Sequence, residues 1–132
     1  MKIEQHEEAL KEHLNQLDRG IEEGIVESQR NIAFNISQGS VELVSIYLHK
    51  LNLIEGSGDQ LDHRTFRSKN LIEKKLPVTF PRRNEILDLM KYIQDERNVL
   101  CYGSRKPLKR VRDLIQNFRK LQKIIENPAN KK

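Results

Sequence analysis

Arg97 occupies a position where the spacing of the chain predicts a hydrophobic residue. Apolar side chains recur at Ile86, Met90 and Ile93, and the next position on that helical stripe is Arg97, followed by Leu100. A buried guanidinium without a partner is strongly unfavourable, so Arg97 must meet a carboxylate, a carbonyl, a neighbouring subunit or a phosphate. The sequence leaves open two main interpretations, a buried ion pair with Asp or Glu and an anion-binding site.

Polar and basic residues adjoin Arg97 along the chain. Asn98 and Tyr102 are four residues apart and therefore neighbours on a helix surface, so we expect a small polar cluster where the helix ends at Gly103. A basic run then opens the next helix and consists of Arg105, Lys106, Lys109, Arg110 and Arg112. Cations at a helix N-terminus oppose the helix dipole, and a bound anion would relieve that conflict. The run predicts either a phosphate-binding surface or a solvated basic face.

The four histidines do not form a metal site by their spacing. His6 and His13 share one helix face but lie about 10 Å apart at about 1.5 Å per residue, too far to bind one ion. His49 and His63 can approach Arg97 only through tertiary packing. No metal ion is therefore expected.

Other catalytic motifs are absent from the sequence. Cys101 is the single cysteine, cannot form an internal disulfide, and is predicted to be a small core residue. The glycine turn at 56–58 lacks the Lys-Ser or Lys-Thr pair that follows in a phosphate-binding P-loop. We therefore expect neither ATP hydrolysis nor a cofactor.

Five amphipathic segments must position these residues. The predicted helices span residues 3–17, 21–54, 62–75, 81–102 and 107–126. Gly39 and Ser40 lie in the apolar stripe of the long second helix, where small side chains favour the close approach of another helix. The glycines of residues 55–59 predict a loop. We expect an all-α, up-and-down antiparallel bundle of about five helices, with the segment 21–54 at its centre.

Composition limits the chain to one domain and suggests a polyanionic partner. The 132 residues are 36% hydrophobic, which suits a single helical domain, 1–126, followed by a C-terminal tail, 127–132. Residues 1–60 carry five basic and eleven acidic side chains, whereas residues 61–132 carry nineteen basic and eight acidic ones, so the net charge of +5 conceals charges of −6 and +11. We find no signal peptide and no apolar run near the roughly 18 residues of a membrane span, so we expect a cytoplasmic protein without a membrane partner.

The helix end at 96–103 resembles the Arg-polar-x-x-x-His motif of HEPN domains, and the likeness extends over roughly residues 20–120. Tyr102 occupies the family's histidine position. Active HEPN proteins are metal-independent ribonucleases that usually dimerise, with both copies of the motif lining a shared cleft. The resemblance therefore implies an HEPN-like helical bundle, a homodimer, and contact between Arg97 and the scissile phosphate with assistance from Asn98.

Tyr102 determines how much catalysis this resemblance implies. The family's histidine moves a proton near neutral pH, whereas a tyrosine, with an ordinary pKa of about 10, is a poor general base. Tyr102 can still donate a hydrogen bond to phosphate or stack on a base. We expect an RNA-associated protein, catalytically weak or inactive, that engages phosphate through Arg97, Asn98, Tyr102 and the basic run.

Two other functions are open at this point. A helical interaction module, such as the partner of a nucleotidyltransferase or a toxin–antitoxin component, would place the same residues at a protein interface, because Arg97 lies on an apolar stripe. A metal-independent RNase would recruit His49 or His63, from another helix or a second subunit, for the missing proton transfer. Salt-dependent RNA binding, measured alongside cleavage, separates these functions.

Overall fold

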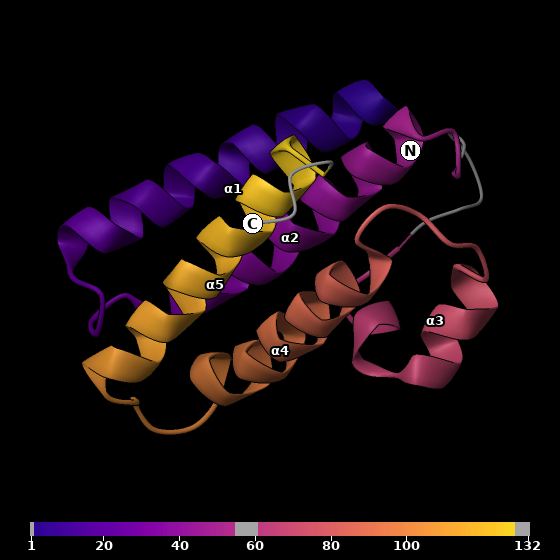
Figure 1. Cartoon of the computed structure of the whole chain (residues 1–132). Coiled ribbons are helices and arrows are strands. Elements are labelled where there is room, and N and C mark those ends of the chain that lie inside the picture. The colour runs from indigo at the N-terminus through magenta and orange to yellow at the C-terminus, as the bar shows by residue number, and fades with distance from the viewer. Residues whose placement is uncertain (1, 55–60, 129–132) are drawn as a thin grey trace.

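The computed structural model describes residues 2–54 and 61–128, which form helices and no strands (Figure 1). In chain order the elements are α1 (Ile3–Glu23), α2 (Gln29–Lys50), the short 3-10 helix η1 (Thr65–Arg67), α3 (Lys69–Lys75), α4 (Arg83–Cys101) and α5 (Leu108–Glu126). The predicted all-α bundle of five helices is confirmed. Four of them are long, and α3 lies in the connection between α2 and α4.

The four long helices alternate in direction, as an up-and-down bundle requires. Contacts between helices establish these directions, because partner residues run in opposite order along antiparallel helices. The contacts are His6–Glu42 and His13–Asn35 between α1 and α2, Gln94–Ser37 and Cys101–Arg30 between α2 and α4, and Glu96–Arg110 and Tyr92–Asn117 between α4 and α5. Consecutive long helices are therefore antiparallel.

Helix α2 is the centre of the bundle, as predicted for the second helix. It packs against α1, α4 and α5, and 15 of its 22 residues are buried, so an exposed apolar side chain on α2 is an exception. A β-carbon built on Gly39 would stand 3.5 Å from the β-carbon of His13 on α1 and 3.7 Å from the Phe118 ring on α5. The small residue thus lies where two helices approach α2 closely.

The prediction of one helix over residues 21–54 is wrong at both ends. Helix α1 continues past residue 17 to Glu23, a turn follows, and α2 begins at Gln29 and ends at Lys50. Gly24 closes α1 with a φ of 127°, a conformation that disfavours residues with a β-carbon, and its N–H donates to the Gly20 carbonyl. The apolar spacing continues across this turn, which is why periodicity alone joined the two helices.

The predicted helix over 62–75 is correct at its end, where α3 stops at Lys75, and wrong in its first half, which contains the separate short helix η1. Ser68 separates them with extended backbone angles, and its hydroxyl accepts a hydrogen bond from the Leu71 N–H, which makes it the N-cap of α3. Gly103 follows the end of α4 with a φ of 87°, as predicted for a terminator. The predicted loop at 55–59, and residues 129–132 of the predicted tail, lie outside the described residues.

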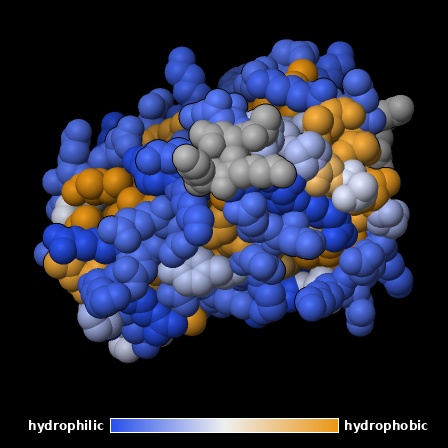
Figure 2. Space-filling view, in the orientation of Figure 1, coloured by the Kyte–Doolittle hydropathy of each residue, from blue (hydrophilic) through white to orange (hydrophobic). Residues whose placement is uncertain are grey.

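Most of the surface facing the viewer in Figure 2 is hydrophilic, with hydrophobic areas toward the left and right of the view. A groove of about 920 Å³ runs between α1, α2 and α5 and is lined largely by aliphatic side chains, among them Leu10, Leu14, Leu43 and Ile46. Within residues 2–54 and 61–128, none of the helices has both the length and the apolar character needed to cross a membrane.

Candidate anion-binding site

Arg97 is buried on α4 and faces α2, and none of the acidic side chains that the structure describes forms an ion pair with it. Its side chain is 9% exposed, and its guanidinium carbon lies 5.4 Å from the centre of the Phe34 ring. The Nε and Nη1 atoms are buried and have no hydrogen-bond partner among the described residues. Of the two interpretations left open by the sequence, the buried ion pair with Asp or Glu does not form within this part of the chain.

The two carboxylates that precede Arg97 are engaged by other cations. Glu96 accepts two hydrogen bonds from Arg110, from Nε and Nη2, each at 2.9 Å. Asp95 lies 2.6 Å from the Lys91 ammonium and 3.3 Å from Nε of Arg67. The charge of Arg97 is therefore not balanced by its neighbours on α4.

Phe34 is the aromatic partner of Arg97 and one of the few exposed residues of α2. Its side chain is 42% exposed, and the His13 ring of α1 lies 6.2 Å from it in an edge-on arrangement at 71°. His13 is held in turn by a 2.8 Å hydrogen bond between Nδ1 and the side-chain oxygen of Asn35. An exposed phenyl ring is thus fixed between a histidine and a buried guanidinium.

Two further arginines lie near Arg97, because the charge of Arg30 acts with that of Arg97 on Cys101, and the charge of Arg67 acts with that of Arg97 on His63. Arg30 of α2 donates to the Gly103 carbonyl at 2.9 Å, and the Cys101 thiol donates to the Arg30 carbonyl at 3.6 Å. Burial lowers the pKa of His63 below its ordinary value of 6.5, and the positive charge of Arg97 lowers this pKa further. His63 therefore lies within electrostatic reach of Arg97. We call Arg97, Phe34, His13, Arg30, Arg67 and His63 the Arg97 cluster.

Cys101 lies one helical turn after Arg97 and is half-buried. Burial raises the pKa of its thiol, whereas the positive charge of Arg97 opposes the rise. The thiol therefore stays protonated near neutral pH and packs as a small residue, as predicted.

The three motif residues point to different neighbours rather than to one centre. With its amide oxygen turned toward η1, Asn98 accepts hydrogen bonds from Nη1 and Nη2 of Arg67 at 2.7 and 3.1 Å. Tyr102 follows the last residue of α4, has an extended backbone and is 65% exposed. Arg97 contacts α2, Asn98 contacts η1, and Tyr102 faces solvent, so the predicted compact polar cluster does not form within one chain.

The first part of the basic run holds the α4–α5 loop against the start of α2. Arg105 donates through Nη1 to the carbonyls of Val26 and Glu27 at 2.6 and 2.7 Å. The backbone N–H and carbonyl of Lys106 pair with the side-chain amide of Gln29 at 2.8 and 3.1 Å. These contacts close the turn between α1 and α2, which gives Arg105 a structural role.

The second part of the run is also partly engaged within the bundle. Lys109 contacts Asp113 at 3.0 Å, one turn further along α5. Arg110 donates two hydrogen bonds to the Glu96 carboxylate. Arg112 is exposed. Adjacent residues are about 100° apart around a helix, so Arg97 faces α2 while Glu96 and its partner Arg110 occupy the α5 side of α4. The structure therefore separates most of the basic run from Arg97.

The other two histidines, His6 on α1 and His49 on α2, lie together away from Arg97. His6 on α1 contacts the Glu42 carboxylate through Nδ1 at 2.9 Å, and its ring centre is 5.3 Å from that of His49. His49 is fifteen residues after Phe34, about 22 Å along the helix, so within one chain it cannot serve the Arg97 cluster. No three His, Cys, Asp or Glu side chains of the described ranges are grouped to hold a metal ion.

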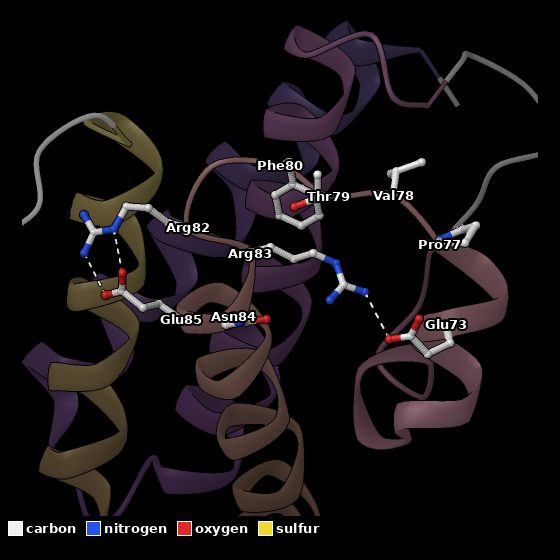
Figure 3. A pocket seen from close by; sticks show the side chains of 9 residues that line it. All are labelled: Glu73, Pro77, Val78, Thr79, Phe80, Arg82, Arg83, Asn84 and Glu85. Atoms are coloured by element: carbon white, nitrogen blue, oxygen red, sulfur yellow. Dashed lines mark hydrogen bonds and ion pairs between the residues drawn. The ribbon is translucent and has the colours of Figure 1, made fainter.

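A second polar site lies between α3 and the start of α4. Figure 3 shows this pocket of about 480 Å³, with Arg82 and Arg83 among the residues that line it. Arg82 binds the Glu85 carboxylate at 2.7 and 2.9 Å, and Arg83 contacts Glu73 at 3.4 Å and donates to the Leu76 carbonyl at 3.2 Å. Both guanidinium groups already face carboxylates, so this pocket is the weaker candidate for an anion.

Sequence reasoning identified Arg97 but missed Phe34, His13 and Arg67. Phe34 lies off the apolar stripe of α2, so an unexplained aromatic residue on the polar side of a helix was the available signal. No protein-family model, curated protein or solved structure matches the chain.

Proposed function

We propose that this chain binds RNA through the Arg97 cluster and has little or no catalytic activity of its own. The observation that carries the proposal is the buried guanidinium of Arg97, of which two nitrogen atoms lack a hydrogen-bond acceptor among residues 2–54 and 61–128. Arginine matches the oxygen geometry of phosphate, and a phosphate at the exposed edge of this guanidinium would balance a charge that no carboxylate of the described residues balances. A buried cation kept without a carboxylate is unfavourable for folding, which favours a role in binding.

The surrounding charges support an anion as the ligand. Arg30, Arg67 and His63 add positive or ionisable groups around Arg97, whereas Asp95 and Glu96 are engaged by other cations. The HEPN resemblance also assigns Arg97 to phosphate. Low catalytic activity follows from Tyr102, which is exposed, follows the end of α4 and is a poor base at neutral pH.

A metal-independent RNase is the second candidate, and one observation favours it. The lowered pKa of His63 keeps its imidazole largely neutral at pH 7, where it can accept a proton from an RNA hydroxyl. His63, in the connection between α2 and α3, would then carry out the proton transfer that Tyr102 cannot carry out at the motif. Cleavage that requires both His63 and Arg97 would favour this candidate.

RNA binding is tested by fluorescence anisotropy with a labelled single-stranded RNA at low and moderate salt, alongside a cleavage assay. The variants are Arg97→Met, Tyr102→His, and Arg112→Met as a control that removes an exposed arginine from α5. Loss of a charged hydrogen bond to phosphate is worth about 1.5–3 kcal/mol, so Arg97→Met should weaken binding by roughly 10- to 100-fold. Arg112→Met should cost only a few-fold. If neither the parent nor Tyr102→His binds or cuts RNA at low salt, the proposal fails, and a protein-interaction role takes its place.

The proposal includes a homodimer, as the resemblance implies. The exposed Tyr102 and the separation of the motif residues in one chain favour a site that is completed by a second copy. Sedimentation at micromolar protein, with and without RNA, should give twice the monomer mass. A strict monomer in both conditions would contradict a shared cleft while leaving RNA binding by Arg97 open to its own test.

A further inference from the structure

We infer that the Arg97 cluster takes single-stranded nucleic acid, with one unpaired base stacked on Phe34 while a neighbouring phosphate meets Arg97. This inference rests on the proposed function and specifies its substrate class. Phe34 is 42% exposed on a helix whose other apolar residues are nearly all buried. Its ring can therefore be reached from solvent, although α2 itself is the central helix of the bundle.

Phe34 is held as a fixed platform rather than as a mobile surface residue. The Arg97 guanidinium lies 5.4 Å from its ring centre, and the His13 ring packs 6.2 Å away from the α1 side. The backbone that carries Phe34 belongs to α2, and the residues before and after it, Ala33 and Asn35, are both buried. Binding to such a ring needs no ordering of the side chain, which lowers the entropic cost of stacking.

The depth of the two groups indicates how a strand would enter. The Phe34 ring is 42% exposed, whereas Arg97 beside it is 9% exposed. A base is joined through its sugar to the neighbouring phosphate. The distance of 5.4 Å between the Phe34 ring centre and the guanidinium carbon of Arg97 is within the reach of one nucleotide. The base therefore covers the outer ring while the phosphate approaches the inner cation.

A duplex does not fit this arrangement. Bases in a duplex stack on each other, so their faces are covered, and the rigid backbone cannot bring one phosphate inward to a buried side chain. Unpaired bases expose a face that stacks on aromatic side chains, with little dependence on base identity. The cluster therefore predicts a preference for single strands over duplexes, with weak sequence selectivity.

The first experiment uses the absence of tryptophan from the sequence. Phe34→Trp introduces a single indole at the platform, and its fluorescence should be quenched by a 12-residue single-stranded RNA. The same RNA annealed to its complement, and a strand of the same length with abasic sites, should quench little. Equal quenching by the intact and abasic strands would overturn stacking, because the backbone is common to both.

The second experiment separates stacking from an indirect effect of Phe34 on Arg97. Affinities are measured for the parent and Phe34→Leu with intact and abasic strands, with Leu71→Ala as a control because Leu71 is also 42% exposed. Phe34→Leu should weaken intact strands roughly 10-fold and leave abasic strands unchanged. If Phe34→Leu weakens both strands equally, or neither, while Arg97→Met abolishes binding, the inference fails and the proposed function stands. If the parent binds no strand at low salt, both fail.

Discussion

Replacing Arg97 with methionine should stabilise the protein. The substitution keeps a long, flexible side chain of similar reach but removes a guanidinium that is 9% exposed and has two nitrogen atoms without acceptors in the described part of the chain. Most substitutions of buried residues destabilise a fold, so a gain in stability here is a specific consequence of an unpaired buried cation. It would also show that the arginine is retained for a purpose other than folding.

The magnitude follows from the contacts of Arg97. Each buried polar group without a partner costs about 1–3 kcal/mol, and Arg97 has two such groups. The cation–π contact with Phe34, about 1–2 kcal/mol when partly desolvated, is lost in the variant. The residual exposure of Arg97 reduces the burial cost, so we expect a net gain of about 1–2 kcal/mol in the free energy of unfolding. For a chain of this size that corresponds to a rise of about 4–8 °C in Tm.

Urea unfolding followed by circular dichroism measures this change, and Arg110→Met supplies a control of opposite sign. Arg110 binds the largely buried Glu96 carboxylate through two hydrogen bonds, so its loss leaves a buried charge unpaired. Arg110 itself is 43% exposed, and solvent screening limits the expected loss to about 1 kcal/mol. If Arg97→Met also lowered the unfolding free energy by 1 kcal/mol or more, Arg97 would have an internal partner and would not be an unpaired buried cation.

Further predictions concern pH and the glycines. The folded-state pKa of His63 lies below its ordinary value of 6.5, so the unfolded chain binds a proton at His63 more tightly than the folded chain does. The free energy of unfolding should therefore keep its full value above about pH 6.5 and fall as the pH drops below 6.5. Arg97→Met should raise the His63 pKa in an NMR titration, and an unchanged pKa would place the two residues apart. Gly39→Ala should raise the unfolding free energy by about 0.5–1 kcal/mol, because its β-carbon would make only ordinary contacts, whereas Gly20→Ala should lower it, because its β-carbon would stand 2.9 Å from Ile32; equal thermal shifts would contradict this. Gly24→Ala should lower the unfolding free energy by about 1 kcal/mol or more, since its φ of 127° disfavours alanine, and an unchanged Tm would contradict this.

The helices were predictable where an apolar stripe alone defines them, and less so where tertiary contacts end them. Residues 107–126 were predicted within one residue of α5, because a proline precedes the stripe and Asn-Pro follows it. The turn between α1 and α2 was missed, since it depends on Gly24 and on the distant Arg105, which donates to two carbonyls of the turn. A local sequence pattern cannot predict a contact between residues that are nearly eighty positions apart.

Arg97 could be identified as unusual from the sequence, but the residues around it could not be predicted. A cation on an apolar stripe identified Arg97, and burial at 9% exposure agrees with that position. Its neighbour Phe34 comes from another helix and lies off the stripe of that helix, so spacing along the chain did not connect the two. The basic run was read from composition, whereas its partners Glu96 and Asp113 depend on packing between α4 and α5 and on one helical turn of α5.

The most direct test of the account is the response of the Arg97 side chain itself to RNA. A ¹⁵N-labelled sample gives an Nε–H signal for each ordered arginine, and the Arg97 signal is assigned by its absence from the spectrum of Arg97→Met. On titration with single-stranded RNA, we expect this signal to shift and to exchange more slowly with water as a phosphate binds the guanidinium. Shifts confined to arginines outside the Arg97 cluster, with the Arg97 signal unmoved at saturation, would show that RNA does not bind at Arg97.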